Sequence, residues 1–271
     1  PSERCGHTIS YRGSEYWGHH TGKGEGDVCC WRLVDEESEF CFWHKVVDEK
    51  SPEDVPNQNS DRLERLDGAH LPNIEYEKYP IKRNTTLNHA NLKNIDAGDS
   101  DLTNVKLNGA NLYNANLKRS VLSRAEFRHA NLSNANASGA DLSGSHFAEA
   151  QLAGANLQDA NATVCSAREA KFHGSDLTDT KFTGAYLSES HFIGVTASGS
   201  DFTNCKMPRT DFTSATLDGA ILSDSNLKGS IFSNSNVSRA KFSNCDISSA
   251  TFENCNATET IFKNVIALNS S

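Results

Sequence analysis

The residues best suited to chemistry lie near the start of the chain. Four of the eight cysteines fall between Cys5 and Cys41, and the sequence CFWH places a histidine three positions after a cysteine. Cys-x-x-His is a metal-ligand spacing, because one turn presents a thiolate and an imidazole to the same tetrahedral ion. We therefore predict a structural zinc site formed by Cys5, Cys30, Cys41 and His44.

The same stretch offers alternatives to this ligand set. Cys29 adjoins Cys30, and adjacent cysteines rarely both bind one ion comfortably, so either could be the ligand. His7, His19 and His20 are other donors, although their surroundings, WGHHTGKGEGD, suggest a mobile loop and lack the spacing of a phosphate-binding loop. The cysteines could instead be merely buried. A redox pair of Cys29 and Cys30 would need an exposed thiolate with a lowered pKa.

Charge and hydropathy limit the classes of partner. The chain has 35 acidic and 26 basic residues, a net charge of -9, which does not favour binding to duplex DNA or to an anionic membrane. No run approaches the ~20 apolar residues of a membrane-spanning helix. The first residues, PSERCGHTIS, lack the apolar core of a signal peptide. We expect a cytoplasmic protein.

An apolar residue recurs every five positions from Leu87 to Ala267. All 37 of these centres are Leu, Phe, Ala, Met, Val or Ile, and a small residue almost always stands two places earlier, as at Ala90 and Ser100. A period of five fits neither a helix nor an alternating strand. A coil that turns a corner after each unit brings every centre to one axis. The small residues would also face inward, where a larger side chain would collide with the next coil.

The repeated units identify a family. ANLKN, SDLTN, ANLYN, ADLSG and SNLKG resemble the A(D/N)LXX motif of the pentapeptide-repeat family, and the resemblance extends over about residues 85–269. It implies an all-β fold: a right-handed, four-sided β-helix with twenty residues per coil. About nine coils at a spacing of ~4.8 Å would form a rod ~43 Å long. The pattern CG…CCWR…CFWH is similar to small Cys/His modules that precede such arrays.

These patterns divide the chain into three parts. We expect a Cys/His-rich module stabilised by zinc at 1–50, a linker and cap at 51–84, and the β-helix at 85–271. Within the middle part, DRLERLDGAHLPN looks like one isolated repeat around Leu71, out of phase with the rest. The segment IEYEKYPIKRN is expected to cover the open end of the first coil, because an uncovered coil exposes strand-like edges.

A twenty-residue coil predicts which residues share a column. Alanine centres separated by multiples of twenty define one face, which we expect to pack closer to the axis. This is a simpler reading than a buried ligand. Phenylalanines are frequent at the centres in the second half of the repeat. Three cysteines would share a column two coils apart, ~9.6 Å, which exceeds the ~7 Å limit for a disulfide. Free core thiols favour a reducing compartment. The alanines are Ala97, Ala137, Ala197 and Ala257, and the cysteines are Cys165, Cys205 and Cys245, with Cys255 also in a small inward position.

No catalytic constellation is evident in the repeat. Its histidines occupy outward positions of the unit, no GxSxG occurs, and its aspartates stand where the motif has Asp or Asn, so we expect them to accept turn hydrogen bonds. We do not expect an enzyme. The histidines are His89, His129, His146, His173 and His191, and the aspartates are Asp101, Asp141, Asp176, Asp201 and Asp211.

The sequence therefore favours a rigid, non-enzymatic scaffold that binds an unidentified protein. The alternative is mimicry of DNA, since some members of the family are acidic rods that bind type II topoisomerases. From residue 85 onward the net charge is only -3, and basic residues interrupt an acidic stripe: Lys171, Lys181, Lys206, Arg209 and Lys241. A duplex carries charge along its whole length. Val121, Ile221 and Ile261 should share one face, and the last coil is a candidate surface for a homodimer.

Overall fold

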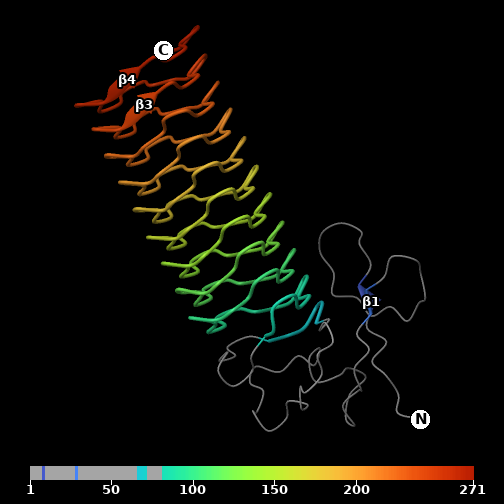
Figure 1. Ribbon diagram of the computed structural model, residues 1–271. Coiled ribbons are helices and arrows are strands. Elements are labelled where there is room, and N and C mark those ends of the chain that lie inside the picture. Colours follow the sequence, from blue (N-terminus) through green and yellow to red (C-terminus); the bar gives the residue numbers. More distant parts are fainter. Residues whose placement is uncertain (1–7, 10–27, 30–65, 72–80) are drawn as a thin grey trace, which may run out of the picture.

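The computed structural model describes residues 8–9, 28–29, 66–71 and 81–271. From residue 81 onward the chain winds into coils that stack along one axis, and the described part contains no α-helix (Figure 1). The short strands β1 (Thr8–Ile9) and β2 (Val28–Cys29) pair antiparallel, and β3 (Lys241–Ser243) and β4 (Ile261–Lys263) pair parallel. Apart from β1 and β2, the predicted module at 1–50 lies outside the described residues, and so does most of the predicted cap.

The twenty-residue coil is confirmed by the strand pairing. Every bridge from Thr86–Lys106 to Asp246–Ile266 is parallel and joins residues twenty positions apart, as β3 and β4 also do. Four turns divide each coil, so the cross-section has four sides. The centres of one face recur every twenty residues. We name each face after its first centre: the Leu87, Leu92, Ala97 and Leu102 faces.

Each five-residue unit satisfies its backbone donors in a fixed way. The N–H of the centre Leu87 donates to the carbonyl of Lys106 at 2.7 Å, the N–H of His89 donates to Asn108, and the N–H of Ala90 closes a turn to Leu87. The N–H before each centre donates to the preceding coil. The N–H after the centre has no backbone acceptor, and in many units an Asp or Asn side chain two residues earlier supplies one, as Asn111 does for Tyr113. This side-chain acceptor satisfies the N–H of the turn, which explains the Asp or Asn of the motif.

The second residue after each centre turns the corner with a positive φ. Asn, Gly and Asp are frequent at these corners, as at Asn114 with φ 57° and Gly219 with φ 69°. These residue types enter the left-handed region most readily. The composition of the corners therefore follows from their backbone conformation.

The core lies on the axis of the rod. The centres and the small residues two places before them are buried along the array as far as Ala250. Ala97, Ala137 and Ala197 share one column, as predicted. In the second half, Phe172, Phe192, Phe212, Phe232 and Phe252 stack in succession, with ring centroids 4.6–5.1 Å apart.

Residues 66–71 form part of a coil beneath the first regular one. The N–H of Leu66 donates to the carbonyl of Thr86, and the N–H of Leu71 donates to Asn91, both at 2.7 Å. His70 bridges Asn91, whereas the regular bridges join residues twenty positions apart. One extra residue therefore separates this coil from the next, which accounts for the shifted phase of the predicted repeat around Leu71.

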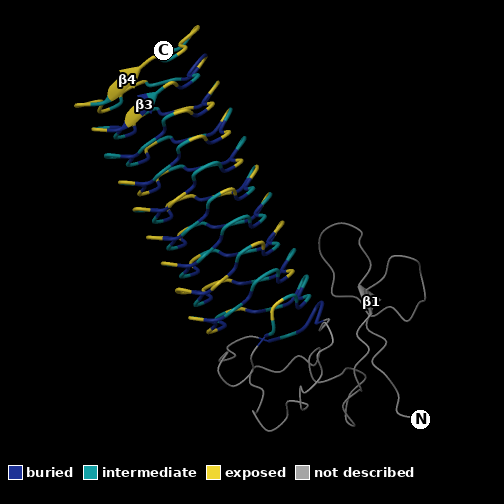
Figure 2. Cartoon of the chain, viewed as in Figure 1, coloured by how far each residue is buried: buried dark blue, intermediate teal, exposed yellow. Residues whose placement is uncertain are grey.

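The last coil exposes its core positions. Phe262 is 44% exposed, although it stacks on the fully buried Phe242, and Ile266 and Leu268 are 56% and 67% exposed. Figure 2 shows this end of the rod mostly as exposed ribbon, whereas the inner ribbon of the earlier coils is buried. The described surface is thus most apolar at the C-terminal coil.

Candidate functional site

The predicted zinc ligands Cys5, Cys30, Cys41 and His44 lie outside the described residues. The same holds for the alternative ligands His7, His19 and His20, and for Cys29 only the backbone in β2 is described. Within the described part of the chain, no three His, Cys, Asp or Glu side chains are grouped so as to hold a metal ion. The described residues also include no helix long and apolar enough to cross a membrane.

The aspartates of the repeat bind their own turns, as predicted. The carboxylates of Asp101, Asp141, Asp176, Asp201 and Asp211 each accept a hydrogen bond from the N–H two residues later, at 2.8–3.1 Å. The hydroxyl of Thr103 also donates to Asp101 at 2.7 Å, and these bonds together lower the pKa of Asp101. Each of these carboxylates has a structural role in the described coil.

The histidines do not form one site. His173 and His191 meet edge to face with ring centroids 5.8 Å apart, and burial, followed by the nearby His191 and Lys171, lowers the pKa of His173. His129 pairs with Glu149 in a neighbouring coil. His89 is half-buried against Gly109, where an added Cβ would lie 2.5 Å from its Nδ1, and burial lowers its pKa. All five histidines occupy outward positions of the unit, as predicted, and His89 lies at a corner where it packs against the next coil.

The four described cysteines are free thiols at small inward positions, and three of them share one column, as expected. Cys165, Cys205 and Cys245 are buried and Cys255 is half-buried. The thiol of Cys205 donates to the carbonyl of Phe182 at 3.0 Å, and burial raises its pKa to about 12. A thiol with a raised pKa is a weak nucleophile at neutral pH. These cysteines are packing residues.

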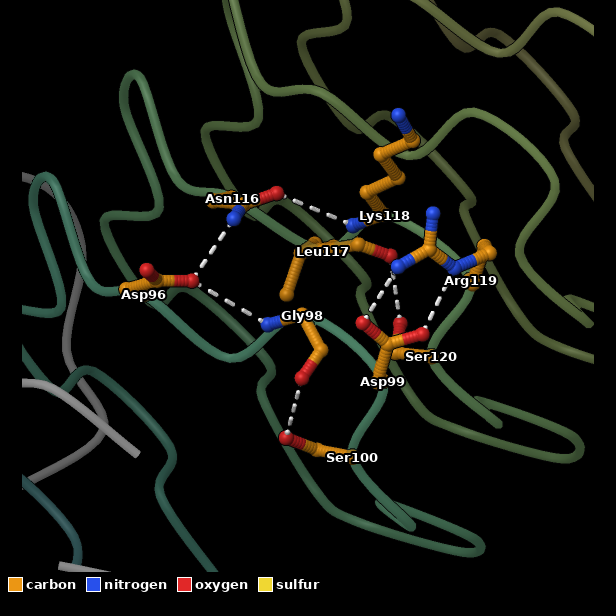
Figure 3. A network of polar contacts seen from close by, with 9 residues as sticks. All are labelled: Asp96, Gly98, Asp99, Ser100, Asn116, Leu117, Lys118, Arg119 and Ser120. Atoms are coloured by element: carbon orange, nitrogen blue, oxygen red, sulfur yellow. Dashed lines mark hydrogen bonds and ion pairs between the residues drawn. The ribbon is translucent and has the colours of Figure 1, made fainter. Parts of the chain in front are cut away.

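The Ala97 face shows how side chains link successive coils (Figure 3). The carboxylate of Asp96 accepts from the N–H of Gly98 at 3.3 Å and from the side-chain amide of Asn116, one coil later, at 2.6 Å. At the corner, the guanidinium of Arg119 binds both oxygens of Asp99 at 2.6 and 2.7 Å. Such rungs fix outward side chains at the spacing of the coils.

The same face carries the negative charge of the rod. Its outward positions hold seven acidic and three basic residues, a net of -4, whereas the other three faces from residue 85 onward hold eleven acidic and twelve basic residues. The basic residues that interrupt an acidic stripe in the sequence all belong to these other faces. Sequence reasoning missed this asymmetry because it summed charge along the chain instead of by column. The acidic residues are Asp96, Asp99, Asp159, Asp176, Asp179, Asp218 and Glu259.

The Leu102 face carries a row of hydroxyls and a shallow hollow. Every residue that follows a centre on this face is Ser or Thr from Thr103 to Ser243. The hollow lies near the start of the row and is lined by Ser123, Arg124, Asp141, Ser143, Thr163 and Val164 among others. Val121, Ile221 and Ile261 were predicted to share one face. The ladder of bridges through these residues shows that this is the Leu102 face. The rod can therefore present fixed patterns of charge, hydroxyls and apolar side chains.

Comparisons with known families match nearly the whole described rod. A model for pentapeptide repeats in eight copies matches residues 83–119, 110–148, 145–184 and 170–207, and one for a pentapeptide repeat region matches 195–271. No curated protein matches the chain significantly.

Several solved structures are similar. HetL of Nostoc sp. strain PCC 7120, a pentapeptide repeat protein involved in heterocyst differentiation regulation, is 24% identical, with a TM-score of 0.42 over 76% of this chain and 88% of HetL. QnrB1, a plasmid-mediated fluoroquinolone resistance protein, is 20% identical, with a TM-score of 0.39 over 73% of this chain and 89% of QnrB1. A pentapeptide repeat protein of the Arabidopsis thaliana thylakoid lumen is 30% identical over 34% of this chain and 61% of its own length, with a TM-score of 0.29.

Proposed function

Since the chain belongs to the pentapeptide-repeat family, whose members fold as right-handed quadrilateral β-helices, we propose that it is a non-enzymatic scaffold that binds another protein. The supporting observation is the continuous ladder of backbone bonds between coils. This ladder holds the outward side chains of the rod at a regular spacing of ~4.8 Å per coil. A surface fixed in this way loses little conformational entropy on binding.

The scaffold is tested by affinity capture with the full chain from extracts of its source cells. We expect a partner whose retention is lost when outward residues of one face are charge-reversed, while variants of the segment 1–50 still retain it. Capture that depends on the segment 1–50 alone, or no specific capture, would contradict a rod that binds protein. Circular dichroism and gel filtration of each variant show whether its fold is intact.

A zinc-stabilised head is the second part of the proposal. The spacing of Cys41 and His44, with Cys5 and Cys30 as the other ligands, supports a structural zinc ion. A small module with few aliphatic residues gains folding energy from such an ion. Elemental analysis should find one zinc per chain, lost in a Cys41→Ala/His44→Ala variant. A metal-free native chain would rule this head out.

Mimicry of DNA is a second candidate function, favoured by the charge of the Ala97 face. Its net of -4 along the rod has the sign of a duplex, but a duplex carries about one charge per 1.7 Å of its axis, or roughly 25 over ~43 Å. The charge is therefore several-fold too low, which is why we prefer the scaffold. A topoisomerase supercoiling assay decides: inhibition that disappears when Asp159, Asp176 and Asp179 become Asn would establish the mimic.

The last coil is proposed to bind a second copy of the chain. Ile261, Phe262, Ile266 and Leu268 form an exposed apolar surface there, and burial of apolar surface drives association. Light scattering should show a dimer that dissociates in a Phe262→Asp/Leu268→Asp variant. A monodisperse monomer at high protein concentration would exclude this interface. The proposed location in the cytoplasm is supported by the four free thiols of the rod.

A further inference from the structure

We propose that the hollow between Arg124 and Val164 on the Leu102 face is a docking site for an extended acidic segment of a partner protein, with a carboxylate of that segment bound to Arg124. The inference rests on the proposed scaffold function and assigns it to one part of the rod. The hollow spans successive coils near the N-terminal end of the array.

A missing side chain creates the hollow. Arg124, Gly144 and Val164 occupy the same corner in three successive coils, and the corner after them is Gly184. A Cβ added at Gly144 would lie 3.6 Å from Cγ of Arg124, so the stem of the arginine borders the space that Gly144 leaves open. Arg124 and Val164 thus form two walls, two coils apart, or ~9.6 Å.

Arg124 carries a charge that the described rod does not compensate. Five other arginines pair with a carboxylate, whereas Arg124 makes no ion pair with any residue that the structure describes. Arginine forms short, charge-assisted hydrogen bonds to carboxylates and is frequent at the centres of interfaces. An anionic group of the partner is therefore the complement of this wall. The paired arginines are Arg83, Arg119, Arg168, Arg209 and Arg239.

Asp141 also lines the hollow and determines the kind of anion that fits. Its Oδ1 accepts from the N–H of Ser143 at 3.1 Å and from the amide of Asn161 at 3.0 Å. A compact dianion such as phosphate would be repelled by this carboxylate. A peptide carries N–H donors beside its acidic side chains, so it can donate to Asp141 and bind Arg124 at once. Together, Arg124 and Asp141 favour the binding of an extended peptide over that of a free anion.

Val164 stands where the conformation disfavours it. Its φ is 56°, and among the described residues it is the only β-branched one with a positive φ. Such residues are outliers in the left-handed region. Its side chain is 60% exposed, so it contributes little to the core. An apolar wall for a bound segment gives this side chain a role that the fold alone does not.

Hydroxyls complete the surface between the walls. Ser123, Ser143 and Thr163 follow one another in successive coils, and none of their hydroxyls makes a hydrogen bond with a described residue. Two other hydroxyls of the row are already bonded: Thr103, which also lines the hollow, donates to Asp101, and Thr183, beyond the hollow, donates to Asp201. The three hydroxyls at the hollow are therefore available to the peptide groups of a bound segment.

The test uses the full chain and a phage-displayed library of random linear peptides. Selection against the native chain should enrich peptides that contain Asp or Glu beside a small apolar residue. The affinity of a synthesised peptide should fall at least about tenfold for Arg124→Gln, which removes a charge-assisted bond. Arg128→Gln is the matched control: Arg128 lies in the same coil, is exposed and makes no ion pair in the described part, but it does not line the hollow.

Val164→Gly separates docking from folding. Glycine removes the backbone strain, so the midpoint of thermal unfolding should not fall, while the affinity for the peptide should. A lower midpoint together with unchanged affinity would overturn the role of Val164. Enriched peptides that bind Arg124→Gln and Val164→Gly as tightly as the native chain would overturn the site yet leave the scaffold standing. A failure to enrich any peptide overturns the site, and the capture experiment then decides the scaffold separately.

Discussion

The ring of Phe212 stacks on the ring of Phe232 one coil later, with centroids 5.1 Å apart and planes inclined by 8°. Phe192 stacks on the other side of Phe212 at 5.0 Å. Phe212 is fully buried, and Phe202 on the opposite face meets its edge at 5.8 Å. Because three neighbouring rings surround this buried side chain, its packing should contribute more to stability than that of rings at the end of the rod.

Phe212→Ala is therefore predicted to destabilise the rod strongly. Removal of a buried phenylalanine costs about 3–5 kcal/mol, because transfer free energy is lost and a cavity remains. Phe262→Ala is the control, since Phe262 also stacks on a ring but is 44% exposed, and its loss should be much smaller. Chemical unfolding of both variants measures the difference. Equal losses of unfolding free energy would show that the contribution of a stacked ring to stability does not depend on its burial.

The corner at Gly219 predicts a purely conformational effect. Gly219 has φ 69°, and an added Cβ would meet no heavy atom within 4 Å. Gly219→Val should cost about 1–2 kcal/mol of unfolding free energy, because a left-handed conformation is unfavourable for an L-residue. Gly219→Asn should cost less, since asparagine tolerates this conformation. Urea unfolding compares the two variants. An equal cost would mean that a contact of the added side chain, and not the backbone conformation, determines the loss of stability.

Much of this architecture could be predicted because each unit is determined locally. The five-residue period, the inward small residues and the bonds of Asp101 and Asp211 to their own turns all depend on residues within one unit. The shared column of Cys165, Cys205 and Cys245 follows once the coil has twenty residues. Strict repetition therefore converts a sequence pattern directly into spatial neighbours.

Features that depend on differences between coils could not be predicted. The extra residue between Leu66 and Leu87 breaks the period, so the sequence indicated an isolated repeat around Leu71 but not that it stacks beneath the first regular coil. The hollow arises because Gly144 lies between two larger corner residues, a relation between positions two coils apart. The zinc ligands remain a prediction, because their residues lie outside the described structure.

The turn at Asp101 predicts a dependence of stability on acid pH. The hydroxyl and the N–H of Thr103, followed by the charge of Arg83, lower the pKa of Asp101 in the folded chain. A carboxyl with a lowered folded pKa contributes stability above its unfolded pKa of about 3.9, and this contribution is lost as the pH falls through the folded pKa. Asp101→Asn keeps an acceptor for the turn but removes the charge. Its unfolding free energy should therefore fall less than that of the native chain between about pH 5 and pH 3.

The control for this titration is Thr103→Ala, which removes the hydroxyl and keeps the N–H. The pKa of Asp101 should then rise toward its ordinary value, so the loss of stability on acidification should be smaller than in the native chain and should be complete at a higher pH. Parallel pH profiles for all three chains would mean that Asp101 does not contribute to acid unfolding.

The described cysteines are predicted to differ in reactivity according to their depth in the rod. Burial raises the pKa of Cys205 to about 12, and its thiol is enclosed beneath the carbonyl of Phe182. Cys255 is only half-buried, in the last coil, beside Ser235. Since alkylation requires an accessible thiolate, iodoacetamide at neutral pH should label Cys255 well before Cys205. Peptide mapping by mass spectrometry resolves the two sites and separates them from the cysteines of the segment 1–50. Denaturant should abolish the difference, and equally fast labelling of Cys205 in the native chain would mean that the coils open far more readily than their continuous hydrogen bonding implies.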